Sequence, residues 1–140
     1  MSRIETQSSP LLTYGASPEE IAFSFLGNGA STPLLTSVQG CALIASLTHV
    51  STGIIAVTMT VPINLVVIPD GNIDELASPD SSWVTVGDFA NEGTSTPLTF
   101  QVSVWTPGAT YAQKPLADPA VGRRVSVRLR VRRSAWGAMK

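Results

Sequence analysis

Three arginines separated by single residues stand near the end of the sequence: Arg128, Arg130 and Arg132. Guanidinium groups bind carboxylates and phosphates through paired hydrogen bonds, so a row of them can dock onto an acidic protein or a nucleic acid. Apolar residues alternate with these arginines from Val125 to Val131. Alternate side chains of a strand share one face, about 7 Å apart. The pattern therefore predicts an arginine row on a strand whose opposite face is buried.

The charge distribution bears on which partner such a row would bind. Six of the nine Lys and Arg residues lie between Arg123 and Ser134. Between Ile4 and Gly122 one basic residue, Lys114, stands against all ten acidic residues, a net charge of −9. A polyanion would meet repulsion over most of this chain, and the polar face of the arginine strand has no aromatic side chain on which bases could stack. We therefore expect a protein partner, and a nucleic-acid-binding β protein is the less favoured alternative function.

Two interpretations of the arginine row stay open. In the first, the arginines neutralise carboxylates of their own chain and protect an edge strand from pairing with other chains. Candidates for these carboxylates are Asp70, Asp74, Glu75 and Asp88. In the second, the arginines bind carboxylates of another protein or of a second copy of this chain. We adopt the second as the working hypothesis.

Catalytic and metal-binding patterns are missing from the sequence. His49 is the single histidine, and Cys41 is the single cysteine. If both lay on one strand they would be about 26 Å apart, too far for a nucleophile and its base. No phosphate-binding loop, nucleophile elbow, paired-cysteine motif or zinc-protease motif is present. We expect no enzymatic activity, no cofactor and no metal site.

Two tryptophans are candidates for a protein interface. Trp105 has the polar parity of its predicted strand, together with Gln101, and Trp136 follows the arginine strand. Exposed tryptophan often anchors an interface because it buries a large area with few rotatable bonds. Burial of each ring under a loop or under the N-terminal segment is the alternative.

The N-terminal segment, residues 1–20, is polar with scattered apolar residues and is predicted to form an extended arm. Ser17–Glu20 has the composition of a helix start, with a possible cap and a following proline. The expected anchors of the arm on a partner are Leu11, Leu12 and Tyr14. Residues 21–140 are long enough to bury a core of their own and are predicted to be one domain.

Apolar residues from Ile21 onward recur with a period of two, which is typical of half-buried strands. The predicted strands are Ile21–Phe25, Leu43–Leu47, Ile55–Val67 with a break at Pro62, Ser82–Phe89, Leu98–Val104 and Val125–Val131. The segments Asp70–Ser81 and Pro107–Val121 are predicted to be surface loops. Seven or eight short strands with almost no helix predict an all-β fold, a jelly-roll-like antiparallel β-sandwich.

The arm of residues 1–20, the all-β body and the late strand SVRLRVRRS together resemble the jelly-roll cement, or decoration, proteins of tailed double-stranded DNA bacteriophages. The resemblance implies a structural virion protein that bridges neighbouring major capsid proteins and stabilises the shell against internal DNA pressure. It implies a homodimer, or alternatively a homotrimer, on the capsid surface. No residue of that family is matched individually, so the interface candidates come from this sequence alone.

Two further expectations concern location and an alternative function. The longest apolar stretch, Gly53–Ile68, is interrupted by polar residues and proline, so no membrane span is expected. Residues 1–15 lack the pattern of a signal peptide, which predicts synthesis in the host cytoplasm. The alternative function is a tail-fibre or receptor-binding head domain that recognises glycans, for which Trp105 with Gln101 is the local indication.

Overall fold

Alternating apolar and polar residues form the strands of this chain, whose computed structural model describes residues 19–74, 82–106 and 115–132. The strands are β1 (Glu19–Leu26), β2 (Ile44–Ser51), β3 (Ile54–Met59), β4 (Leu65–Ile73), β5 (Trp83–Ala90), β6 (Thr99–Trp105) and β7 (Arg124–Arg132). One short 3-10 helix, η2 (Leu35–Ser37), lies between β1 and β2. Among the described residues no helix has the length and apolar character that a membrane span requires.

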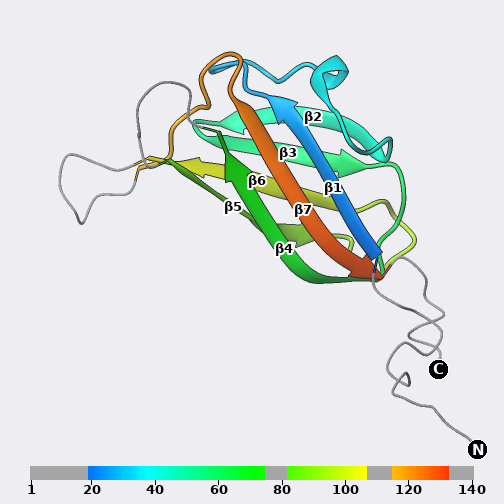
Figure 1. Ribbon diagram of the computed structural model, residues 1–140. Coiled ribbons are helices and arrows are strands. Elements are labelled where there is room, and N and C mark those ends of the chain that lie inside the picture. The colour runs from blue at the N-terminus through cyan, green and yellow to red at the C-terminus, as the bar shows by residue number, and fades with distance from the viewer. Residues whose placement is uncertain (1–18, 75–81, 107–114, 133–140) are drawn as a thin grey trace, which may run out of the picture.

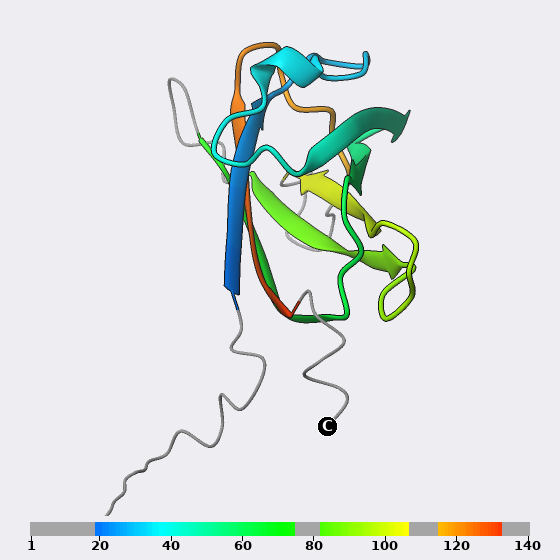
Figure 2. The same ribbon diagram turned by 90° about the vertical axis from the view of Figure 1, so that its right-hand side faces the viewer.

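The strands form two antiparallel sheets that pack as a sandwich (Figures 1 and 2). One sheet has three strands in the order β1-β7-β4, and the other has four in the order β2-β3-β6-β5. The chain passes between the sheets four times, and its first strand pairs with its last. The predicted all-β sandwich is confirmed. Figure 2 shows the two layers edge-on, with β1 and β7 in one layer and β2 and β6 in the other.

The core lies between the two sheets and is built around aromatic rings. Phe23 and Phe25 of β1 stack with ring centroids 6.5 Å apart, and Phe23 also meets Phe100 of β6 at 6.3 Å. Phe25 and Phe100 are fully buried. Burial of each such side chain contributes roughly 1.5–3 kcal/mol, which makes the inner faces of the sheets the main source of stability.

The long apolar pattern from Ile55 onward is divided between the two sheets. Ile55 and Ile63 are buried, as their common parity predicts. The chain then crosses to the three-stranded sheet, and Leu65 and Val67 are exposed at the start of β4. A single alternation over the predicted strand Ile55–Val67 would bury Leu65 and Val67 as well. It does not hold, because the parity restarts when a strand enters another sheet and a bulge shifts the register of β4 beside Val67.

A second bulge corrects the predicted inner face of β2. The register with β3 shifts between Ile44 and Ser46, so Ile44 and Leu47 are buried while Ala45 is exposed. Strict alternation had placed Leu43, Ala45 and Leu47 on one face. One extra residue in a bulge reverses the parity of everything that precedes it.

The start of the first strand and the end of β4 also differ from the predictions. β1 begins at Glu19, so Glu20 belongs to a strand and the helix start predicted for Ser17–Glu20 was wrong in its described part. β4 continues to Ile73, so Asp70 does not begin a loop. Pairing with β7 over this whole length supplies the hydrogen bonds that override the local turn signal.

The edges of the three-stranded sheet are partly blocked. At β1 the amide of Ser24 donates to Gln39 O and the amide of Gln39 donates to Ser24 O, both at 2.9 Å. At β4 the amide of Val66 donates to Glu92 Oε2 at 2.5 Å. Pro69, also on β4, has no amide hydrogen to offer. These features hinder the addition of a strand from another chain.

The edges of the four-stranded sheet carry comparable features. At β2 the amide of His49 donates to Thr32 Oγ1 at 3.1 Å. At β5 the pairing with β6 is interrupted between Gly87 and Ala90, and Asp88 takes a φ of 55°. Bulges and side-chain caps of this kind are common protections of edge strands. Within the described residues each edge strand is therefore modified, which leaves the sheet faces as the surfaces for association.

Gly71 of β4 packs closely against β5 of the other sheet. A Cβ atom at this position would stand 2.5 Å from Val84 Cγ1 and 3.1 Å from Val86 Cγ2 of β5. The role of Gly71 is therefore close packing, and the turn that the dipeptide Asp70-Gly71 suggests is absent.

Replacement of Gly71 by alanine is expected to destabilise the protein by about 1–3 kcal/mol, since the methyl group overlaps Val84. The matched control is Gly87→Ala in β5, where the added atom meets nothing within 4 Å. Urea unfolding followed by tryptophan fluorescence measures both variants. Equal stability of the two variants would contradict the close approach at Gly71.

Candidate docking surface on the three-stranded sheet

The arginine row lies on the outer face of β7, the central strand of the three-stranded sheet. Its inner residues from Val125 to Val131 are buried, while Arg128 and Arg130 are exposed and Arg132 is half-buried. The predicted alternation along this strand is confirmed. The interpretation that this strand is an edge in need of protection was wrong, because β1 and β4 flank it on both sides.

Arg128 makes one ion pair within its own chain. Its Nε atom lies 3.0 Å from Glu20 Oε2, and the two side chains are 65% and 51% exposed. Such open pairs contribute about 0–1 kcal/mol and exchange readily for other partners. Asp70 is the register neighbour of Arg128 on β4, but its Oδ1 atom accepts a hydrogen bond from the amide of Gly71 at 2.9 Å. The pairing carboxylate of Arg128 is therefore Glu20 and not Asp70, and the expected candidate Glu75 lies outside the described residues.

Arg130 and Arg132 have no ion pair within the described part of the chain. Arg130 stands in register between Glu20 on β1 and Ile68 on β4, and its side chain is exposed. Arg132 lies beside Leu65, and its Nε atom is buried without a hydrogen-bond partner. The exposed guanidinium group of Arg130 thus keeps hydrogen-bond donors available for a partner, whereas the buried Nε atom of Arg132 is out of a partner's reach.

The outer face of this sheet carries a positive net charge. The charged side chains that alternate outward are Arg124, Arg128, Arg130, Arg132, Glu20 and Asp70. Four positive charges against two negative charges give +2. Glu19 also belongs to β1, but it stands opposite Val131 on the inward parity. This face, called the arginine face below, is therefore complementary to an acidic surface.

Arg123 and Asp74 form a structural contact at the start of β7. Arg123 is buried, and its Nε donates to the carbonyl oxygen of Asp74 at 2.8 Å, a bond that Nη2 also makes. Asp74 Oδ1 in turn accepts from the amide of Arg124 at 2.6 Å. Asp74 was expected to pair with the arginine row, but it binds the chain before that row. The first arginine of the basic run has a structural role.

Trp105 lies on the other side of the sandwich. It is half-buried on the outer face of the four-stranded sheet, directly opposite Trp83 of β5. The two rings stack with centroids 6.4 Å apart and planes 10° apart, and Trp105 Nε1 donates to Thr85 Oγ1 at 2.8 Å. Trp83 is 36% exposed. The predicted interface residues therefore do not form one surface.

The remaining interface candidates cannot be placed. Leu11, Leu12, Tyr14 and Trp136 lie outside the described residues.

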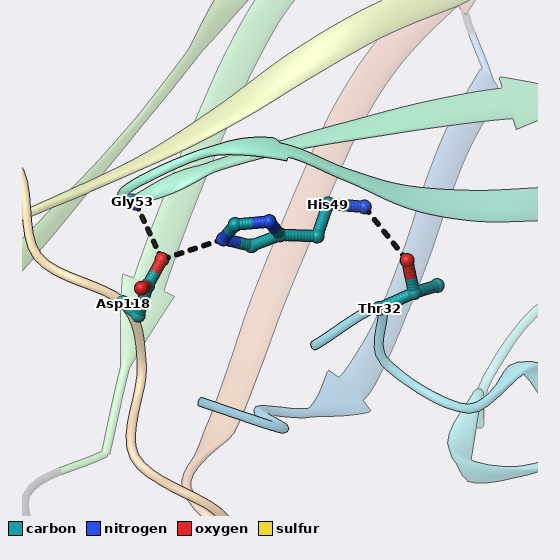
Figure 3. A network of polar contacts seen from close by, with 4 residues as sticks. All are labelled: Thr32, His49, Gly53 and Asp118. Carbon is teal, nitrogen blue, oxygen red and sulfur yellow. Dashed lines mark hydrogen bonds and ion pairs between the residues drawn. The ribbon is translucent and has the colours of Figure 1, made fainter. Parts of the chain in front are cut away.

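His49 takes part in a polar contact that the sequence did not reveal (Figure 3). Its Nε2 atom lies 2.8 Å from Asp118 Oδ1, and the amide of Gly53 donates to the same oxygen at 2.7 Å. Burial acts to raise the pKa of Asp118, but the hydrogen bonds from Gly53 and His49 and the charge of His49 outweigh it, so the pKa is lowered. The contacts of Asp118 with His49 and Gly53, called the clasp, join the β2–β3 hairpin to the segment that precedes β7.

The clasp has the chemistry of a structural link. Its hydrogen bonds join Asp118 to His49 and Gly53, and the His49 amide to Thr32. Among the described residues no nucleophile is hydrogen-bonded to the imidazole ring. In the described part of the chain no group of three or more His, Cys, Asp or Glu residues could hold a metal ion. A spacing of 69 residues between His49 and Asp118 leaves no local motif by which the pair could have been predicted.

No protein-family model, curated protein or solved structure matches the chain. The function is therefore argued from the geometry of the two sheet faces.

The lowered pKa of Asp118 predicts a pH-dependent contribution to stability. The folded state favours the carboxylate, so this contribution is fully present above the unfolded pKa and is lost as pH falls through the folded pKa. At neutral pH Asp118→Asn should destabilise the protein by roughly 1–3 kcal/mol. Urea unfolding at neutral pH and near pH 3 measures the difference from the parent protein, which should shrink at the lower pH. A difference that stays constant would contradict the clasp.

Proposed function

We propose that this chain is a structural virion protein that decorates a bacteriophage capsid and cements neighbouring major capsid proteins. The observation that carries the proposal is the arginine face: within the described part of the chain Arg130 and Arg132 have no ion pair and Arg128 has one exposed pair, all on a central strand. Bidentate binding of carboxylates on the shell would use these free donors. The partner is the major capsid protein, and a second copy of this chain is the further partner.

The protected edges favour association through a sheet face. Strand addition needs a free row of amides and carbonyls, but Gln39 and Glu92 occupy such groups at β1 and β4. A face bound through side chains leaves the sandwich unchanged on docking. Protein partners that associate without backbone rearrangement avoid an entropic cost, which suits a module added to a finished shell.

Modest affinity at each contact is sufficient for a cement. When one oligomer bridges two or three shell subunits, the second contact forms at a high effective concentration and strengthens the first. A homodimer or homotrimer of this chain would provide such bridging. The exposed pair between Arg128 and Glu20 offers little resistance to exchange for a shell carboxylate, since both groups remain solvated.

Replacement of Arg128 and Arg130 by serine is expected to lower occupancy on the capsid about tenfold or more, because interfacial arginines commonly contribute over 1 kcal/mol each. The measurement is co-sedimentation with assembled particles of the virus that carries this gene, quantified as copies per shell protein. The double variant should keep the unfolding midpoint of the parent, since both side chains are exposed.

The matched control replaces the same two arginines by lysine. This variant keeps the charge but loses the planar fork, so occupancy should fall between that of the parent and that of the serine variant. Unchanged occupancy of the serine variant would remove the arginine face from the interface. A genome that encodes this chain without any major capsid protein would contradict the proposal as a whole.

A glycan-binding head domain is the second candidate function, and the Trp83–Trp105 pair is the observation that favours it. The stacked rings lie on a face where neighbouring side chains such as Thr85, Gln101 and Ser103 are polar and uncharged. Aromatic surface beside hydroxyl and amide groups can bind a sugar ring. The anchoring of Trp105 by Thr85 fixes the orientation of its ring.

If this second function holds, Trp83→Ala and Trp105→Ala should each abolish binding to a glycan array. The control is Arg130→Ser, on the opposite face of the sandwich, which should leave glycan binding unchanged. Failure of the parent protein to bind any glycan on the array would eliminate the candidate.

A further inference from the structure

A groove crosses the outer face of the three-stranded sheet, the sheet nearest the viewer in Figure 1. Its volume is about 430 Å³. The floor consists of small side chains on β1 and β7, namely Ala22, Ser24 and Ser126. Short side chains bring the sheet backbone close to the surface, so a partner's main chain could lie near it.

One wall of the groove is the segment that contains Gln39 and Gly40. The paired backbone bonds between Ser24 and Gln39 hold this segment against the edge of β1. Gly40 has a φ of 95°, and a Cβ atom there would stand 2.9 Å from Ala22 O. The wall is therefore closely packed on the strand, and the groove is formed before any partner binds.

The charges around the groove define what it can accept. Arg128 pairs through its Nε atom with Glu20, and the two side chains are 65% and 51% exposed, so its guanidinium group is accessible to a further carboxylate. Asp70 stands in register with Arg128 on β4 and lines the same groove. A single carboxylate can therefore bind this guanidinium group, whereas a segment with several negative charges would also meet the carboxylate of Asp70.

Neutral hydrogen-bonding groups occupy the rest of the lining. Ser126 Oγ and the side-chain amide of Asn72 have no hydrogen bond within the described residues, and Gln39 presents a further amide. Together these groups supply donors and acceptors that match the alternating groups of an extended peptide. The absence of aromatic side chains from the outward lining gives a sugar ring no surface on which to stack.

We infer that this groove binds an extended, otherwise uncharged segment of the partner protein, in which one Asp or Glu carboxylate binds the exposed guanidinium group of Arg128. The inference rests on the proposed docking function and specifies the chemistry of its central contact. Arg130 and Arg132 then act outside the groove, against the surface that surrounds the bound segment.

The test titrates the full-length protein with two capped peptides, acetyl-Gly-Ser-Glu-Ser-Gly-amide and its Gln analogue, up to millimolar concentration. Amide chemical shifts in ¹H–¹⁵N NMR spectra report the binding site. The Glu peptide should shift the amides of Ala22, Ser24, Gly40 and Ser126, and the Gln peptide should bind at least about tenfold more weakly because the charge-assisted bond is missing.

Two variants with equal net charge provide the control. Arg128→Gln should abolish the preference for the Glu peptide, while Arg130→Gln should retain it. Ser126→Phe, which fills the floor, should prevent binding of both peptides.

Equal binding of the two peptides, shifts confined to other surfaces, or tighter binding of tripolyphosphate at the same amides would overturn the inference. The experiment uses no capsid particles. Peptide binding together with failed co-sedimentation would therefore support the peptide site. It would reject only the proposal that the capsid protein supplies the bound segment.

Discussion

The burial of the inner face of β7 is the constraint on which the arginine row depends. Val125, Val127, Leu129 and Val131 are all almost completely buried. Because the side-chain period of a strand is two, a slip of one residue would turn the arginines into the core. Burial of unpaired guanidinium groups is very costly, so the apolar residues that hold the sheets together also fix which side chains face a partner.

The two outer faces of the sandwich differ in chemistry as a consequence of strand composition. The four strands β2, β3, β5 and β6 together contain a single Asp, Glu, Lys or Arg residue, which is Asp88. By contrast, β7 alone contains four arginines. In the proposed docking, this charge asymmetry would orient the molecule toward an acidic partner. When the arginine face is docked, the face with Trp83 and Trp105 points away from that partner. One small domain can thus offer two separate surfaces.

The local periodicity of the sequence predicted the strands, whereas most side-chain contacts between strands and loops depend on long-range pairing. The alternation around Phe23 and along β7 was sufficient to identify buried faces. It failed at the bulge in β2 and at the crossing after Pro62, where parity restarts. The pairs Glu20–Arg128 and His49–Asp118 join segments far apart in the chain. They depend on sheet order and register, which a single sequence does not reveal.

The segment before β7 connects the clasp to the arginine face. Asp118 is held by His49 and Gly53, and the amide of Gly27 donates to Arg123 O at 2.7 Å. Arg123 is bound in turn to the carbonyl of Asp74. These contacts come from three different parts of the fold and fix the direction in which β7 enters its sheet. Its backbone loses little freedom on docking, and the entropic cost is confined to the arginine side chains. A strand with a fixed backbone and long arginine side chains can adapt to binding sites that are similar but not identical, and its register in the sheet stays the same.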